Sequence, residues 1–101
     1  MREIKELSEL IEDEIEAATD YTEAAEKTHH EELRRLYVEL AHAELGHIDK
    51  LHTKVKEMIE KTRSKSIIPP AGMLEMWSME HERMVRKVSK IKMRLDVVSK
   101  M

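Results

Sequence analysis

The chain has 101 residues, with 18 lysines and arginines, 21 aspartates and glutamates and a formal net charge of −3. This length corresponds to one small domain, and its 2 glycines and 2 prolines are too few for an all-β sandwich or a dinucleotide-binding α/β unit. The lack of cysteine excludes a disulfide scaffold, a thiolate zinc site and a cysteine nucleophile. Glutamate, lysine, leucine, methionine and alanine predominate, which predicts an all-α fold of long helices.

The first predicted helix spans about residues 2–28. Its apolar side chains recur at intervals of three and four residues, which places them on one face of a helix. One carboxylate, Glu14, lies within this stripe. The stripe consists of Ile4, Leu7, Ile11, Glu14, Ala18, Tyr21, Ala25 and Thr28.

The second predicted helix spans about residues 31–62 and has a similar stripe, interrupted by Glu44 and His47. Only a tight join around His29 and His30 separates the two helices, so residues 1–62 are expected to form an antiparallel helical hairpin. The stripe of the second helix consists of Leu33, Tyr37, Leu40, Glu44, His47, Leu51, Val55 and Met58.

A linker is predicted at residues 63–70, because Pro69 and Pro70 would disrupt a helix interior. The segment 71–101 then forms a third helix, basic and rich in methionine, which we interpret as an oligomerisation element. His81 lies on its apolar stripe and is expected to be a core histidine, with an accessory metal role as the alternative. This stripe consists of Trp77, His81, Val85, Val88, Ile91, Leu95 and Val98.

The distribution of charge and of apolar residues bears on the partners and the location of the protein. Residues 1–62 carry 9 basic and 17 acidic side chains, whereas residues 63–101 carry 9 basic and 4 acidic ones. An acidic body does not suit a nucleic-acid-binding protein. No run of 18 apolar residues could cross a membrane, and the N-terminus lacks the apolar core of a signal peptide. A cytoplasmic location is therefore expected.

Three polar residues, Glu14, Glu44 and His47, interrupt the apolar stripes. A buried carboxylate without a partner costs several kcal/mol or becomes protonated. No lysine or arginine lies on either stripe, apart from the flanking Lys54, to compensate the two carboxylates. Two carboxylates and an imidazole without a cation favour a metal ion such as iron, with manganese or zinc as substitutes. The alternative is a buried polar layer that fixes the register of the helices.

The phase of Glu44 and His47 is more informative than their spacing. Side chains at i and i+3 reach one point on a helix surface, but the same spacing also occurs at residues 26–29 and 39–42. The pair at 26–29 lies near a helix end and the pair at 39–42 on the polar side of its helix. Of the three pairs, only that of Glu44 and His47 interrupts an apolar stripe.

One hairpin supplies only half of a two-metal site. Di-iron carboxylate bundles use a glutamate from each of two helices and a Glu-x-x-His motif from each of the other two. Two copies of this chain related by a twofold axis would supply four glutamates and two histidines around two metal ions. We therefore expect at least a homodimer, in which two hairpins complete a four-helix bundle, and a higher homo-oligomer is the further expectation.

These residues resemble the ferritin-like superfamily. Glu14, Tyr21 seven residues later, and Glu44-x-x-His47 thirty residues after Glu14 are similar to rubrerythrins, and most of all to encapsulated ferritins, whose subunits build a di-iron site between two hairpins. The resemblance covers about residues 4–60. It implies a ferroxidase, serving iron storage or detoxification, that binds two Fe(II) per dimer through Glu14, Glu44 and His47 and oxidises them with O₂ or peroxide.

The resemblance also implies roles for neighbouring residues. Tyr21 would be a hydrogen-bonding or redox-active neighbour of the metals, with a core aromatic residue as the alternative. Asp13 and Glu16 would guide iron to the site, with a solvated acidic face as the alternative. The remaining histidines are interpreted as surface or hinge residues, with a supporting role beside the metals as the alternative for His52, which lies on the flanking stripe. They are His29, His30, His42 and His52.

An encapsulin shell is the partner that the resemblance implies, which would place the protein inside a nanocompartment. Residues 95–101 depart from the family pattern, because they remain helical in pattern where those ferritins have a flexible targeting tail. Two other functions stay open. One is a non-catalytic helical oligomer with a structural polar layer. The other is a rubrerythrin-type peroxidase, which would need a separate electron donor because the chain has no cysteine.

Overall fold

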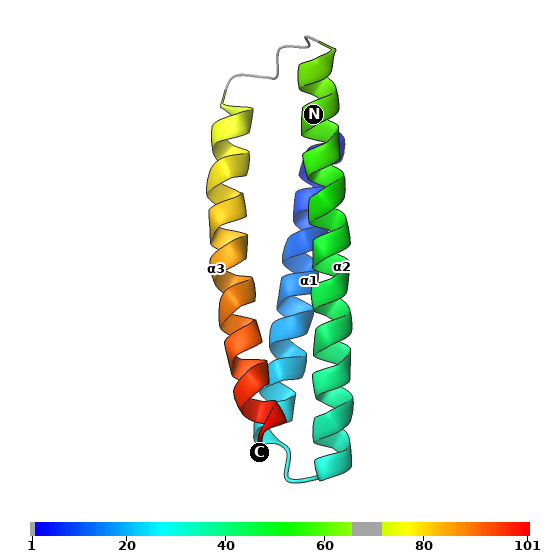
Figure 1. The fold of residues 1–101 in the computed structure, drawn as a ribbon, viewed down its shortest axis with the longest axis vertical. Coiled ribbons are helices and arrows are strands. Elements are labelled where there is room, and N and C mark those ends of the chain that lie inside the picture. The colour runs from blue at the N-terminus through cyan, green and yellow to red at the C-terminus, as the bar shows by residue number, and fades with distance from the viewer. Residues whose placement is uncertain (1, 66–71) are drawn as a thin grey trace.

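A computed structural model describes residues 2–65 and 72–101. Within these residues it contains three α-helices, α1 (Arg2–Lys27), α2 (Glu31–Ser64) and α3 (Met73–Ser99), and no strand. The helices lie side by side along one long axis, with α2 antiparallel to α1 and α3 (Figure 1). The prediction of an all-α fold is therefore confirmed. The helix α2 continues two residues beyond its predicted end, and residues 66–71 of the predicted linker lie outside the described part of the chain.

The turn between α1 and α2 contains neither glycine nor proline, and a side chain of α2 closes it. The guanidinium group of Arg34 donates hydrogen bonds to the backbone carbonyls of Ala25 (3.3 Å) and Thr28 (2.9 Å). These carbonyls lie at the C-terminal end of α1, where they lack partners within the helix. In addition, the His30 backbone N–H donates to the Thr28 hydroxyl at 3.2 Å. A side chain of α2 therefore caps the C-terminal end of α1.

A continuous apolar core joins the three helices. The contribution of α3 follows a regular spacing of four and three residues, with Met84 buried and Val85 46% exposed. The prediction that Val85 faces the core is therefore wrong. Met84 lies about 100° further round the helix and takes the core position. The buried apolar residues are Ile4, Ile11, Ile15, Ala18, Ala25, Ala41, Leu45, Ile48, Val55, Ile59, Met84, Ile91, Leu95 and Val98.

Ion pairs fasten α3 to α1. Lys87 binds Glu12 at 3.2 Å, and Arg94 forms a two-pronged pair with Glu26. The Arg94 guanidinium lowers the pKa of the Glu26 carboxyl, because its hydrogen bonds favour the ionised form. The charges therefore help to select the face of α1 on which α3 lies.

Among the described helices, none is long and apolar enough to cross a membrane.

Three aromatic rings connect α3 to α2. The imidazoles of His52 and His81 stack with centroids 4.5 Å apart and planes inclined by 8°. The indole of Trp77 stacks against both at 5.9 and 5.8 Å. The rings of His52, His81 and Trp77 are all half-buried, so the expectation of His52 as a surface or hinge residue is wrong. The stack gives α2 and α3 a specific contact near the N-terminal end of α3.

Candidate metal centre

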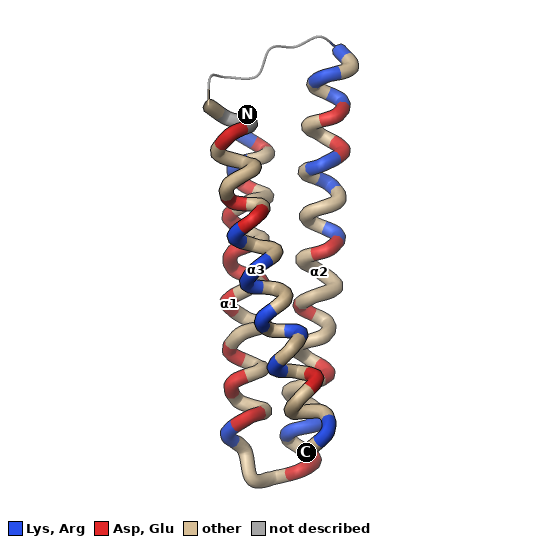
Figure 2. The backbone as a smooth tube through the Cα atoms, turned by 60° about the vertical axis from the view of Figure 1, so that its left-hand side comes forward, with Lys and Arg blue, Asp and Glu red and all other residues tan. Residues whose placement is uncertain are grey.

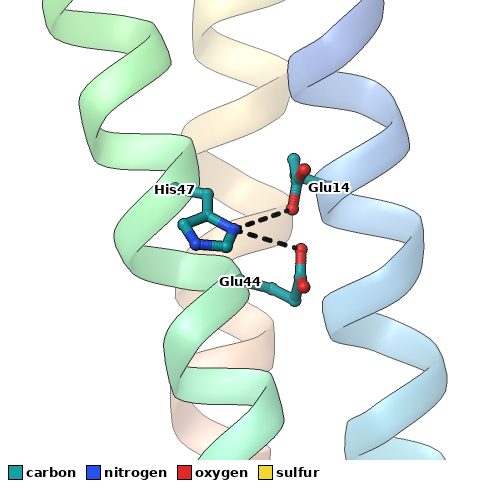
Figure 3. Close-up of side chains that lie close together, drawn as sticks. All are labelled: Glu14, Glu44 and His47. Carbon is teal, nitrogen blue, oxygen red and sulfur yellow. Dashed lines mark hydrogen bonds and ion pairs between the residues drawn. The ribbon is translucent and has the colours of Figure 1, made fainter.

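Glu14, Glu44 and His47 meet at one point between α1 and α2. The Nδ1 atom of His47 lies 3.4 Å from Oε2 of Glu14 and 3.7 Å from Oε2 of Glu44 (Figure 3). One ligand atom from each residue can be chosen so that all three lie within 4.8 Å of one another. The three residues singled out from the sequence as metal ligands are thus neighbours in space, and we call them the triad.

The register of the hairpin brings the triad together. Glu14 lies 13 residues before the end of α1 at Lys27, and Glu44 lies 13 residues after the start of α2 at Glu31. Because an α-helix rises 1.5 Å per residue, each carboxylate is about 20 Å from the turn. The two antiparallel helices therefore carry Glu14 and Glu44 to the same height, and His47 follows one turn further along α2.

The triad lies on the side of the hairpin that faces away from α3. Glu12 reaches α3 through its pair with Lys87, and Glu14 is about 200° further round the same helix. His52 likewise contacts α3, and His47 is about 140° away from it round α2. Figure 3 accordingly shows α3 behind the hairpin and the triad in front of it.

The side chains of the triad are less buried than their place in apolar stripes suggested. Glu14 is 29% exposed, Glu44 is 20% exposed and His47 is 54% exposed. The reason is that α2 has two apolar ridges. One ridge, with Ala41 and Leu45, packs inside the three helices, and the other lies on the outer side of the hairpin with the triad.

The surroundings of the triad are apolar, and several large side chains there are left exposed by the described part of the chain. Leu10, Leu33 and Leu36 are large side chains with 49%, 40% and 45% of their surface exposed. Their spacing from Glu14, Glu44 and the half-buried residues places them all on one side of the hairpin. We call this surface the hairpin face. It consists of the triad with Leu7, Leu10, Ala17, Tyr21, Leu33, Leu36, Leu40, Leu51 and Met58.

The donor set and its geometry fit a divalent metal ion. Ligand atoms bound at about 2.0–2.2 Å in a tetrahedral or octahedral site are roughly 2.8–3.6 Å from their neighbours. The two distances from His47 Nδ1 are close to this range. Within the described residues, neither Glu14 nor Glu44 pairs with a lysine or arginine. Two neighbouring carboxylates and a neutral imidazole are a set of ligands that iron, manganese and zinc all accept.

The other residues that the sequence connected with the site lie further away. Tyr21 packs against the core two turns, about 10 Å, along α1 from Glu14, and no hydrogen bond joins its hydroxyl to the triad in the described part of the chain. Asp13 and Glu16 line a groove between α1 and α3 rather than the hairpin face. His52 contacts α3, so it does not support the triad.

The stripes predicted from the sequence did not include Leu10 and Leu36, which are among the exposed leucines of the hairpin face. The spacing of Leu33, Leu36 and Leu40 by three and four residues is the signal that places Leu36 beside the predicted stripe of α2.

Comparison with known family models, curated proteins and solved structures finds no match.

Proposed function

We propose that this chain is a ferritin-like di-iron carboxylate protein that oxidises Fe(II) to Fe(III) at a site shared by two copies of the chain. The observation that carries the proposal is the convergence of Glu14, Glu44 and His47 from two helices, with no lysine or arginine of residues 2–65 and 72–101 in an ion pair with them. The resemblance to encapsulated ferritins rests on these three positions and Tyr21.

The hairpin face supports a shared site. Three ligands are half of the set that a di-iron carboxylate bundle uses. A twofold axis through the hairpin face would bring a second triad opposite the first and cover the leucines around it, at roughly 25 cal/mol for each Å² of apolar surface buried. The helices α1 and α2 of both copies would then form a four-helix bundle with the metals at its centre.

Iron is the substrate of the proposed reaction. Four carboxylates from two triads balance the charge of two Fe(II) ions, and their negative charge favours the additional positive charge of Fe(III). Each Fe(II) releases one electron. The two electrons, with two protons, reduce one O₂ to hydrogen peroxide or one hydrogen peroxide to two water molecules. His47 would contribute a neutral nitrogen ligand through Nδ1, the ring atom that faces both carboxylates.

The rate of Fe(II) oxidation by O₂ tests this function. Glu14→Ala, Glu44→Ala and His47→Ala should each reduce the rate to that of the buffer. Glu39→Ala and His42→Ala are matched controls, because they have the same spacing on α2 and are exposed. Both control variants should keep the wild-type rate. Wild-type oxidation by Glu44→Ala would exclude the triad as the site of reaction.

A structural role of the triad is the second candidate. The contact of His47 with Glu14 joins α1 to α2, which favours a polar layer that fixes the register of the hairpin. Such a layer would make the stability of the protein independent of metal ions. Thermal melting with and without a chelator therefore separates this candidate from the ferroxidase.

A further inference from the structure

The groove between α1 and α3 has walls of opposite charge. The wall formed by α1 is acidic and the wall formed by α3 is basic, with Ile15 and Ile91 between them. Figure 2 shows this separation along the tube, with red segments on α1 and blue segments on α3. The charged lining residues are Glu12, Asp13, Glu16 and Asp20 on α1 and Lys87, Lys90 and Arg94 on α3.

Only some of these charged side chains form ion pairs within one chain. Glu12 binds Lys87, and Arg94 binds Glu26 beyond the groove. In the part of the chain that the structure describes, the carboxylates of Asp13, Glu16 and Asp20 form no ion pair, and Lys90 has none either. The groove therefore presents unpaired acidic groups of α1 beside an unpaired basic group of α3.

The basic wall continues along the outer side of α3. Arg86 and Arg83 precede Lys90 by four and seven residues, so both lie on the same side of the helix as Lys90. Neither arginine has an ion-pair partner among residues 2–65 and 72–101. Large apolar side chains follow the same spacing and are strongly exposed, with Met79 at 72% and Met93 at 71%. We call this surface, with the acidic wall of α1, the charged face.

We propose that the charged face binds a second copy of the chain, about a twofold axis that runs parallel to the helices. Such an axis places α1 of each copy against α3 of the other, so that acidic residues meet basic residues on both sides. A twofold axis across the helices would instead place α1 against α1. Like charges would then face each other in both halves of the interface.

The pattern of charge selects a second copy over other partners. A purely acidic partner would satisfy Lys90 and Arg86 but would repel Asp13, Glu16 and Asp20. A purely basic partner would have the opposite defect. A partner that presents both signs side by side, at the same spacing, satisfies all of them, and this chain is such a partner. The contact would also cover part of the exposed methionines of α3.

This interface is separate from the metal centre. Glu16 lines the charged face and is about 200° round α1 from Glu14, which lies on the hairpin face. The two faces are therefore on different sides of the hairpin and can be occupied together. If both are occupied, the assembly is larger than a dimer, and the charged face can form whether or not the triad binds metal.

Charge reversal on each wall provides the test. One variant, Arg86→Glu with Lys90→Glu, reverses the charge of two of the three unpaired basic groups on the α3 wall, so that the unpaired groups of both walls are mainly acidic. The other, Glu16→Lys with Asp20→Lys, reverses two of the three unpaired acidic groups on the α1 wall, so that the unpaired groups of both walls are mainly basic. None of these four residues forms an ion pair within the described chain, so each variant should keep its helical content by circular dichroism. By sedimentation at low salt, each variant alone should have no more than half the mass of the wild-type assembly.

Mixing the two variants should restore the wild-type mass, because each acidic wall then meets a basic one. A matched control, Lys50→Glu with Lys92→Glu, changes the net charge as much as the α3 variant but alters exposed residues that do not line the groove, and should keep the wild-type mass. High salt should dissociate the contact in the wild type.

A monomeric wild type, a variant that keeps the wild-type mass, or a mixture that stays at the lower mass would overturn the proposal. Glu44→Ala should leave this contact intact, which separates its failure from that of the ferroxidase.

Discussion

The Nδ1 atom of His47 lies 3.4 Å from Oε2 of Glu14, although 33 residues separate them along the chain. The contact exists because the turn at residues 28–30 is short and fixed by Arg34, so that two straight helices return at the same height. The triad is thus a consequence of helix lengths and one capping side chain. It needs no contribution from α3, which lies on the other side of the hairpin.

The metal-free triad should be a source of electrostatic strain. Glu44→Gln removes one of two neighbouring carboxylates, so the free energy of unfolding in the presence of chelator should stay constant or rise by up to about 1 kcal/mol. Zinc at 100 times its dissociation constant should stabilise the wild type by about 2.7 kcal/mol and should not stabilise the variant. Thermal melting with and without zinc measures both effects. An equal gain in the two proteins would place the bound zinc elsewhere.

The stack of His52, His81 and Trp77 should respond to pH. Burial lowers the pKa of His52, and the positive charges of His81 and Lys56 lower it further, whereas Asp49 opposes this. The unfolded chain therefore binds this proton more tightly than the folded chain does. The free energy of unfolding should fall as the pH drops through the ordinary imidazole pKa of 6.5.

Trp77 is the single tryptophan, so its fluorescence reports on this stack. The emission should change over the same range of pH as the stability. In His52→Phe the pH dependence of both signals should be reduced, whereas His42→Phe, which alters an exposed histidine of the same helix, should leave them as in the wild type. An unchanged profile in His52→Phe would show that His52 is not the group whose titration causes the pH dependence.

Packing of α3 against the hairpin should make a large contribution to stability. Leu95 is 1% exposed, and Leu95→Ala should lower the free energy of unfolding by about 2–5 kcal/mol because it leaves a cavity. Val85→Ala removes a side chain that is 46% exposed and should cost less than about 1 kcal/mol. Urea denaturation of the two variants compares them directly. Equal losses would mean that α3 does not pack through Leu95.

Much of the fold could be predicted from local patterns. The recurrence of apolar residues every three or four positions determined the three helices, and the interruption of two stripes identified Glu14, Glu44 and His47. These features depend on each helix alone. The sequence did not predict the capping of α1 by Arg34, since that depends on how two helices meet.

Phase errors explain the remaining differences. A helix with two apolar ridges buries only one of them in a three-helix fold, so the stripe around Glu44 was predicted to be more buried than it is. Val85 and Met84 are adjacent and both apolar, and only packing decides between them. The stacking of His52 on His81 joins two helices that are distant in sequence, and no pattern within either helix indicates it.

The amount of iron bound per chain is the most direct test of the ferroxidase proposal. The protein would be loaded with Fe(II) without oxygen, desalted and analysed for metal and protein. We predict about one iron per chain, hence two per dimer, with almost none in Glu44→Ala and the wild-type amount in Glu39→Ala. An iron content near zero in the wild type, or an equal content in Glu44→Ala, would contradict the proposal and leave the triad as a structural polar layer.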